Sequence, residues 1–325
     1  MTEPIFNNRL ELTELNEAVG RIKAEVGKVI VGQERNLELM LVCLLCHGHV
    51  LLEGVPGVAK TLTAKLLSRT VNGSFKRLQF TPDLMPSDIL GTSVFNPKTL
   101  EFEYKAGPVF CNLILIDEIN RAPAKTQAAL FELMEERQVT IDGHTYYLPD
   151  PFVVIATQNP VEQEGTYRLP EAQLDRFLMK IQVGYPGREE ELDLLRRFNA
   201  NLQADLSGTV EPVISTERLA RLRALVHQVL LEDHLLKFIA DLIHATRNHQ
   251  MIELGASPRA SLALMNAAKA MAAVSGRDFV IPEDIKTVVM PVLCHRIVLT
   301  PEAEMEGITE EEVLNGLFSG IEVPR

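Results

Sequence analysis

The sequence predicts an α/β fold in which a parallel sheet of five strands is sandwiched by helices and followed by an all-helical lid domain. Short apolar runs alternate with stretches whose apolar residues recur every three or four positions, as buried strands alternate with helices. Beyond residue 215 only the helical spacing remains. We therefore expect an α/β domain over residues 1–210 and a helical domain over residues 211–325.

Five short runs are the candidate strands. They hold five or six residues each, the usual length of a strand in a globular protein. The run at 112–116 ends in four consecutive apolar residues, which is typical of a parallel strand that is covered on both faces. The five runs are residues 49–53, 76–80, 112–116, 152–157 and 178–183.

Composition narrows the class of protein. The chain has 325 residues, 46% of them hydrophobic, and a formal net charge of −12. This acidic balance gives no basic surface for nucleic acid or an anionic membrane. No run reaches the roughly 18 apolar residues of a membrane span, and the first residues lack the pattern of a signal peptide. We expect a cytoplasmic protein without a membrane span or a nucleic-acid partner.

The sequence C-x-x-C-H at residues 43–47 raises a question about haem or zinc. Four cysteines in so long a chain do not form a disulfide framework, and we expect them to be reduced. The segment before Cys46 is apolar on every side for two turns, as in a buried helix, and Gly48 is expected to close that helix. Core packing is therefore favoured, while haem attachment and a zinc site that includes His49 are the alternatives.

A phosphate-binding loop follows the first run. Gly54, Lys60 and Thr61 fit the pattern G-x-x-x-x-G-K-[ST], but Ala59 takes the place of the second glycine. Alanine can donate the required backbone N–H if its φ is negative, and we expect Gly54 and Gly57 to supply the unusual dihedrals. The alternative is a glycine-containing turn with an incidental lysine.

Acidic and amide side chains end the next two apolar runs. The run at 112–116 leads into Asp117, which we expect to hold Mg²⁺ together with Thr61, and into Glu118, which is placed to polarise a water. A solvated acidic turn is the alternative. The run at 152–157 leads to Asn159, a candidate to orient that water or to touch the γ-phosphate.

Seven segments resemble the MoxR family of AAA+ ATPases. Together they lie in family order between about residues 25 and 300, and they read VGQ, LLEGVPGVAKT, TPDLMPSDILGT, DEINRAPAKTQAALFELMEERQVTIDG, ATQNP, GTYRLPEAQLDRF and GASPRAS. The resemblance implies an ATP and Mg²⁺ site in which Lys60 is the Walker A lysine, Asp117 and Glu118 the Walker B pair, and Asn159 sensor 1. The family accepts residues other than glycine at position 59.

The resemblance also implies which residues contact the nucleotide. Residues 31–33 resemble the segment that passes the adenine. The implied nucleotide contacts are Val31, Gly32, Gln33, Gly54, Val55, Pro56, Gly57, Val58, Ala59, Lys60, Thr61, Leu62 and Asp117.

Two arginines are implied to act on the phosphates. Arg176, in LDRF, resembles the arginine finger that reaches the nucleotide of a neighbouring subunit, and Arg259, in GASPRAS, resembles sensor 2, which contacts the γ-phosphate. Arg168 stands where the family pattern has proline, which leaves the choice between Arg168 and Arg176 open. A finger of this kind contributes about 10³ to 10⁵ in rate.

Two insertions and the resemblance give the expected function. Residues 82–110 resemble the helix 2 insert, and residues 137–151 resemble the hairpin before sensor 1, with a turn at Asp142-Gly143. The family implies ATP hydrolysis in a hexameric ring that remodels or activates a partner protein with a von Willebrand A domain. The alternatives are a nucleic-acid motor of the MCM type, a nucleotide-gated scaffold and a magnesium-chelatase-like subunit.

Overall fold

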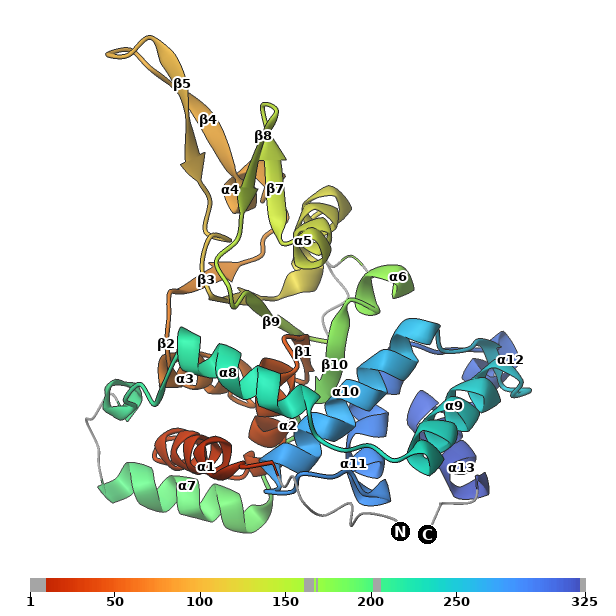
Figure 1. The fold of residues 1–325 in the computed structure, drawn as a ribbon. Coiled ribbons are helices and arrows are strands. Elements are labelled where there is room, and N and C mark those ends of the chain that lie inside the picture. The colour runs from red at the N-terminus through yellow and green to blue at the C-terminus, as the bar shows by residue number, and fades with distance from the viewer. Residues whose placement is uncertain (1–9, 161–166, 168, 201–205, 322–325) are drawn as a thin grey trace, which may run out of the picture.

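A sheet of five parallel strands forms the centre of the structure, a computed structural model that describes residues 10–160, 167, 169–200 and 206–321. The sheet lies between helices, as the fold class predicted from the sequence requires (Figure 1). Its strand order is β10 (Phe177–Gln182), β1 (His49–Glu53), β9 (Val153–Gln158), β6 (Leu113–Asp117) and β3 (Phe75–Gln79). Each strand lies within one residue of the predicted range.

The two faces of the sheet contribute to two separate hydrophobic clusters. Leu52 and Leu115 belong to the larger cluster, whereas Leu51 and Ile114 belong to the smaller one. This alternation follows from the two-residue period of a strand. The helices α1 (Thr13–Gly27), α2 (Glu34–Leu45) and α3 (Lys60–Thr70) pack into the larger cluster, and α5 (Ala124–Glu136) packs into the smaller one.

The end of α2 differs in detail from the prediction. His47, not Gly48, adopts the left-handed conformation, with φ of 56°. The Gly48 N–H donates to the Cys43 carbonyl at 2.9 Å and the His47 N–H to the Leu44 carbonyl at 3.4 Å, the bonding of a Schellman motif. A side chain on Gly48 would meet Leu178 at 2.6 Å. The glycine is therefore required for close packing against β10.

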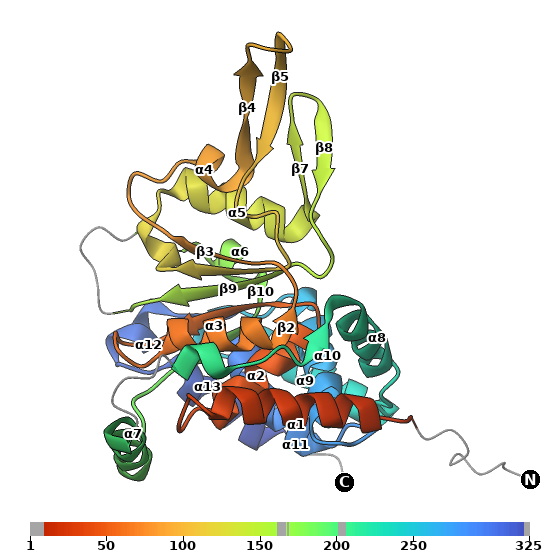
Figure 2. The same ribbon diagram turned by 90° about the vertical axis from the view of Figure 1, so that its left-hand side faces the viewer.

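Two hairpins project from the same side of the α/β domain (Figure 2). The first contains β4 (Gly91–Asn96) and β5 (Glu101–Ala106) and follows the short helix α4 (Pro86–Leu90). The second contains β7 (Gln138–Ile141) and β8 (His144–Tyr147). Asp142 and Gly143 turn this second hairpin with φ of 51° and 78°, so the turn predicted there is confirmed.

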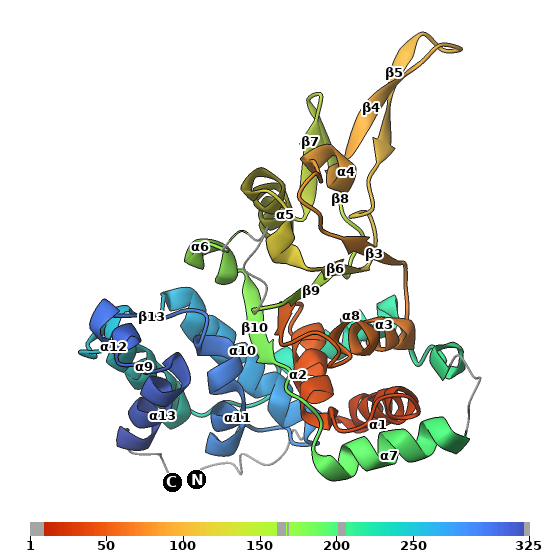
Figure 3. The same ribbon diagram turned by 180° about the vertical axis from the view of Figure 1, so that it is seen from behind.

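The C-terminal part of the described chain is mainly helical and packs directly on α2. Helix α10 (Pro258–Val274) lies beside α2 (Figure 3). The helices of this part share the larger hydrophobic cluster with α1–α3, and the division into two domains stays a prediction. These helices are α8 (Thr216–His227), α9 (Asp233–Arg247), α10 (Pro258–Val274), α11 (Pro282–Leu293), α12 (Pro301–Met305) and α13 (Glu310–Gly320).

Short elements complete the described chain. Before α8 the chain forms β11 (Ile214–Ser215), which pairs with β2 (Val71–Asn72). Helix α7 lies beside α1, and Arg197 of α7 donates to the Gly27 carbonyl at 2.8 Å. None of the helices in the described ranges is long and apolar enough to cross a membrane. The remaining elements are β2 (Val71–Asn72), η1 (Ile119–Arg121), α6 (Glu171–Leu174), α7 (Arg188–Ala200), η2 (Leu206–Thr209), β11 (Ile214–Ser215), β12 (Ile252–Leu254) and β13 (Val298–Leu299).

Two buried histidines make the fold sensitive to acid. Burial lowers the pKa of His49 to about 4 and places the pKa of His295 well below its ordinary value. Each ring binds protons more readily in the unfolded chain, so stability is complete above pH 6.5 and falls as the pH drops below it. At pH 5, the loss for His49 is about 2 kcal/mol.

Urea unfolding at pH 7.5 and pH 5 measures this loss. The His49 Nδ1 accepts the Val154 N–H at 2.9 Å, and His49→Asn keeps an acceptor there without the titration. We expect a smaller loss of unfolding free energy between the two pH values in His49→Asn than in the wild type. The exposed His144→Asn is the control and should keep the wild-type loss. An unchanged loss in His49→Asn would contradict the assignment.

Candidate nucleotide-binding site

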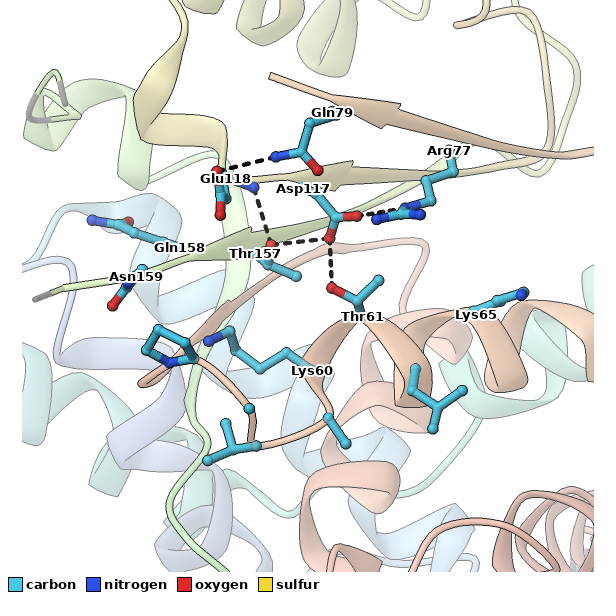
Figure 4. A pocket seen from close by; sticks show the side chains of 15 residues that line it. Lys60, Thr61, Lys65, Arg77, Gln79, Asp117, Glu118, Thr157, Gln158 and Asn159 are labelled. Atoms are coloured by element: carbon cyan, nitrogen blue, oxygen red, sulfur yellow. Dashed lines mark hydrogen bonds and ion pairs between the residues drawn. The ribbon is translucent and has the colours of Figure 1, made fainter. Parts of the chain in front are cut away.

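A cavity of about 550 Å³ opens at the carboxyl ends of β1, β6 and β9 (Figure 4). Parallel strands bring their carboxyl ends to one edge, where ligands of α/β proteins bind. The cavity therefore gathers side chains that lie far apart in the sequence. Its lining residues are Pro56, Gly57, Val58, Ala59, Lys60, Thr61, Leu62, Lys65, Arg77, Gln79, Asp117, Glu118, Thr157, Gln158 and Asn159.

The loop between β1 and α3 differs from two expectations, which concern the conformation of Ala59 and the role of Gly54. Ala59 has φ of 59°, in the left-handed region, and not the negative φ that we expected. Gly57 supplies the predicted unusual dihedral, with φ of 87°. Gly54 is needed for a different reason, because a side chain there would meet the Val183 carbonyl at 2.3 Å. An alanine at φ near 60° costs roughly 1–2 kcal/mol, and the surrounding loop holds Ala59 in that conformation.

Lys60 turns back into its own loop. Its Nζ donates to the Gly54 carbonyl and, at 2.8 Å, to the Val55 carbonyl. Burial lowers the pKa of Lys60, while the nearby carboxylates of Glu118, Asp117 and Glu53 raise it. The ammonium thus lies at the cavity wall with neutral carbonyl partners, where the oxygens of a phosphate would be stronger acceptors.

Asp117 is almost fully buried and saturated with donors. Its Oδ1 accepts hydrogen bonds from Thr61 Oγ1 at 2.7 Å and from Thr157 Oγ1 at 3.2 Å. Its Oδ2 accepts from Arg77 Nε at 2.6 Å. A hydroxyl and a carboxylate are oxygen ligands of the kind that Mg²⁺ prefers. The structure thus already places a positive charge beside this buried carboxylate, and a divalent cation held by Thr61 and Asp117 would supply the same compensation, so the two residues fit such a cation.

Glu118 lies beside Asp117 in a left-handed conformation, with φ of 56°. Its backbone N–H donates to Thr157 Oγ1 at 3.1 Å. The carboxylate Oε2 accepts from Gln79 Nε2 at 3.1 Å and pairs with Arg121 Nε at 3.0 Å. Asn159, at the end of β9, is 7% exposed and lines the same cavity. The structure therefore brings a carboxylate and an amide to the wall opposite the loop.

Gln33 supports the loop from behind. Its Nε2 donates to the Val58 carbonyl at 2.7 Å, and its Oε1 accepts from Thr63 Oγ1 at 3.0 Å. Of the expected nucleotide contacts, the loop residues from Pro56 to Leu62 and Asp117 line the cavity. The structure does not place Val31, Gly32, Gln33, Gly54 or Val55 on its wall.

Comparison with known proteins gives the family. Residues 49–179 match the model of the ATPase family associated with various cellular activities (AAA), and residues 244–317 match the AAA lid domain. The Chaperone MoxR1 of Mycobacterium tuberculosis is 46% identical, over 93% of this chain and 81% of that protein. Protein MoxR of Methylorubrum extorquens is 31% identical, over 96% of this chain and 97% of that protein.

The chain belongs to the MoxR family of AAA+ ATPases. The Bacillus subtilis protein YeaC is 48% identical, with 96% of each chain covered. A crystal structure of a protein from Cytophaga hutchinsonii superposes with a TM-score of 0.88 at 44% identity and covers 97% of each chain. The recognition made from the seven sequence segments is thus confirmed.

The two arginines implied by the MoxR resemblance lie together, far from the nucleotide cavity. Arg176 NH1 donates to the Phe131 carbonyl and lies 3.5 Å from Glu135 Oε2. Arg259 NH2 pairs with the other oxygen, Glu135 Oε1. Both arginines line a second cavity of about 290 Å³ together with Arg137 and other residues. Arg168 lies outside the described residues.

Strand direction explains this separation. Arg176 precedes the first residue of β10, which runs parallel to β1, whereas the phosphate loop follows the last residue of β1. About seven residues at roughly 3.3 Å each place Arg176 about 20 Å from the loop along the strand direction. Neither Arg176 nor Arg259 lines the nucleotide cavity of its own chain.

The cysteines of the C-x-x-C-H sequence take part in packing. Cys43 is buried in α2, and Cys46 Sγ donates to the Asn266 carbonyl at 3.3 Å. Burial raises the pKa of Cys46 to about 12 and that of Cys43 well above its ordinary value. Within the described ranges, no three His, Cys, Asp or Glu side chains form a group that could hold a metal ion.

Four polar residues of the MoxR site were not predicted from the sequence. Arg77 and Gln79 of β3 reach Asp117 and Glu118, Thr157 of β9 bonds both, and Arg121 pairs with Glu118. The sequence carried a signal for Arg77 and Gln79. They are two positions apart in a strand, so they share one face, and β3 neighbours the strand that carries Asp117.

Proposed function

We propose that this MoxR-family AAA+ ATPase binds ATP with Mg²⁺ and hydrolyses it in a ring of subunits, which drives the remodelling or activation of a partner protein. The supporting observation is the gathering of Lys60, Thr61, Asp117, Glu118 and Asn159 in one cavity. These side chains correspond to the separate requirements of phosphoryl transfer, which are phosphate binding, metal ligation and positioning of a water.

Each residue has a defined task in this proposal. Lys60 exchanges the loop carbonyls for β- and γ-phosphate oxygens, and the backbone N–H groups of the loop bind the β-phosphate. Thr61 and Asp117 hold Mg²⁺, which when bound neutralises charge on the phosphates. Glu118 accepts a proton from the attacking water, and Asn159 orients that water.

The distant arginines support a ring. Arg176 and Arg259 lie near the amino end of β10, whereas the nucleotide cavity lies at the carboxyl ends of the strands. In this proposal they therefore reach a nucleotide only in another subunit. An interface that joins two different surfaces repeats head to tail, and it generates a closed ring when the rotation closes. We propose six subunits, the number that the family resemblance implies, with Arg176 and Arg259 acting on the neighbour's nucleotide.

The projecting hairpins are the proposed contacts with the partner. Leu100 and Phe102 of the first hairpin are 74% and 73% exposed, and the rings of Phe95 and Phe102 lie 5.4 Å apart. Exposed apolar groups of this kind are typical of protein interaction sites. One relative is named a chaperone. We propose that this protein is cytoplasmic and that its partner carries a von Willebrand A domain.

Nucleotide binding tests the assignment of the cavity. Lys60→Ala should weaken the affinity for ATP with Mg²⁺ by about ten- to a hundredfold, since hydrogen bonds to a charged group are lost. Affinity is measured by titration with a fluorescent ATP analogue. The exposed Lys125→Ala is the control and should bind like the wild type. Unchanged affinity in Lys60→Ala would contradict the proposed site.

ATP hydrolysis separates the remaining alternatives. The release of phosphate by the wild type distinguishes an ATPase from a nucleotide-gated scaffold, which would bind without turnover. Salt-dependent binding of single-stranded DNA would favour a motor of the MCM type. A dependence of turnover on enzymes of chlorin synthesis would favour a magnesium-chelatase-like subunit.

A further inference from the structure

Arg77 compensates a carboxylate that belongs to the proposed metal site. The Asp117 side chain is 4% exposed, and its only ion-pair partner within the described part of the chain is Arg77, at 2.6 Å. A buried carboxylate without a countercharge is strongly destabilising. Figure 4 shows the Arg77 side chain extending from β3 to Asp117 on the side away from Lys60.

The contact between these two side chains has the features of a pair that can separate. Arg77 donates through Nε alone, instead of the two-pronged arrangement that makes arginine–carboxylate pairs strong. Its side chain is 54% exposed, so the guanidinium returns to water at little cost. Thr61 and Thr157 hold Oδ1 on the other side of the carboxylate, independently of Arg77.

A metal ion beside Thr61 and Asp117 changes the balance of charge. The guanidinium contacts the same carboxylate, so it would stand within a few ångströms of a divalent cation, and like charges at that distance repel. Both cations cannot be favoured at once. The one with the higher charge and two oxygen ligands should prevail.

We propose that Arg77 is a positioning residue that serves as a displaceable counterion: it holds the Asp117 carboxylate in the metal-free chain and gives way when Mg²⁺ binds with nucleotide. The second part of this proposal, the displacement of Arg77 by Mg²⁺, rests on the proposed function, whereas the first part does not. Arg77 therefore stabilises the empty site and competes with Mg²⁺ for it. The apparent affinity for Mg²⁺ is reduced by the fraction of molecules in which Arg77 occupies the carboxylate.

A double-mutant cycle in metal-free protein tests the first half. Unfolding is measured in EDTA without nucleotide for the wild type, Arg77→Gln, Asp117→Asn and the double variant. Arg77→Gln should lower the unfolding midpoint in the wild-type background and leave it unchanged in the Asp117→Asn background. Equal effects in both backgrounds would show that Arg77 does not act through Asp117, and would overturn the proposal.

Thermal unfolding with Mg²⁺ tests the second half. With a saturating non-hydrolysable ATP analogue, the MgCl₂ concentration for half-maximal stabilisation should fall about five- to tenfold in Arg77→Gln. Arg77→Lys keeps a cation and should restore most of the wild-type requirement. Lys76→Gln is the control and should match the wild type, because Lys76 immediately precedes Arg77 in β3 and lies on the other face of the strand.

The possible failures are distinguishable. A higher or unchanged Mg²⁺ requirement in Arg77→Gln would overturn the competition. If the wild type gained no stability from Mg²⁺ and the analogue, the proposed ATP site and the displacement step would both fail. The double-mutant cycle would still decide whether Arg77 is the counterion of Asp117.

Discussion

Arg176→Ala should lower the rate of ATP hydrolysis per subunit by about 10³-fold, which is the low end of the contribution of an arginine finger. The expected loss is large because the transferred phosphoryl group develops charge that a positioned guanidinium stabilises. In the wild type, specific activity should rise with protein concentration as subunits associate. In Arg176→Ala, activity should stay near zero over the same hundredfold range.

The environment of Arg176 supports this role. Its Nε is buried and lacks a hydrogen-bond partner in the described structure, and its NH1 lies 3.5 Å from a carboxylate that Arg259 also binds. The two guanidinium groups contact the two carboxylate oxygens of Glu135, as they would contact two oxygens of a phosphate. A phosphate of the adjacent subunit would take the place of that carboxylate. Arg259→Ala should therefore also reduce turnover.

Controls separate catalysis from folding and assembly. Arg221→Ala changes an arginine of α8 whose side chain is 71% exposed, and it should keep wild-type activity. Sedimentation of Arg176→Ala with nucleotide shows whether rings still form. Activity that is independent of both protein concentration and Arg176 would show that each chain completes its own site, and would exclude the shared-site mechanism.

Sequence predicted the framework of the molecule better than its local conformations. The strands were predicted because burial on both faces leaves apolar runs such as Leu113–Ile116, and motifs tied Lys60 and Asp117 to strand ends. The positive φ of Ala59 and His47 was missed. Intrinsic preference disfavours both conformations, and only the surrounding tertiary contacts impose them.

Contacts between distant segments of the chain were also not predicted from the sequence. The spacing of Arg77 and Gln79 indicates that they share one face of a strand, but the pairing of Arg77 with a carboxylate forty positions away also requires β3 to lie beside β6. The same holds for Glu135 of α5, which binds Arg176 and Arg259 from two distant segments of the chain. Family motifs identified the two arginines, but their distance from the nucleotide cavity depends on the parallel pairing of β10 with β1.

Glu118→Gln should reduce ATP hydrolysis by about 10² to 10⁴-fold, the usual contribution of a general base, while nucleotide affinity stays close to that of the wild type. The amide has the shape of the carboxylate and can still accept the hydrogen bonds from Gln79 and Arg121, so the site should keep its structure. What it loses is the capacity to take a proton from water.

Phosphate release under single-turnover conditions, beside titration with a fluorescent ATP analogue, separates these two effects. Glu132→Gln removes an exposed carboxylate from α5 and should hydrolyse ATP like the wild type. Preserved turnover in Glu118→Gln would assign the base to another group. Loss of affinity together with turnover would instead show that the pairs of Glu118 with Gln79 and Arg121 hold the cavity in shape. Because Gln79 and Arg121 both contact Oε2, Oε1 can take the proton while those contacts persist, which is why the variant should lose turnover without changing the shape of the cavity.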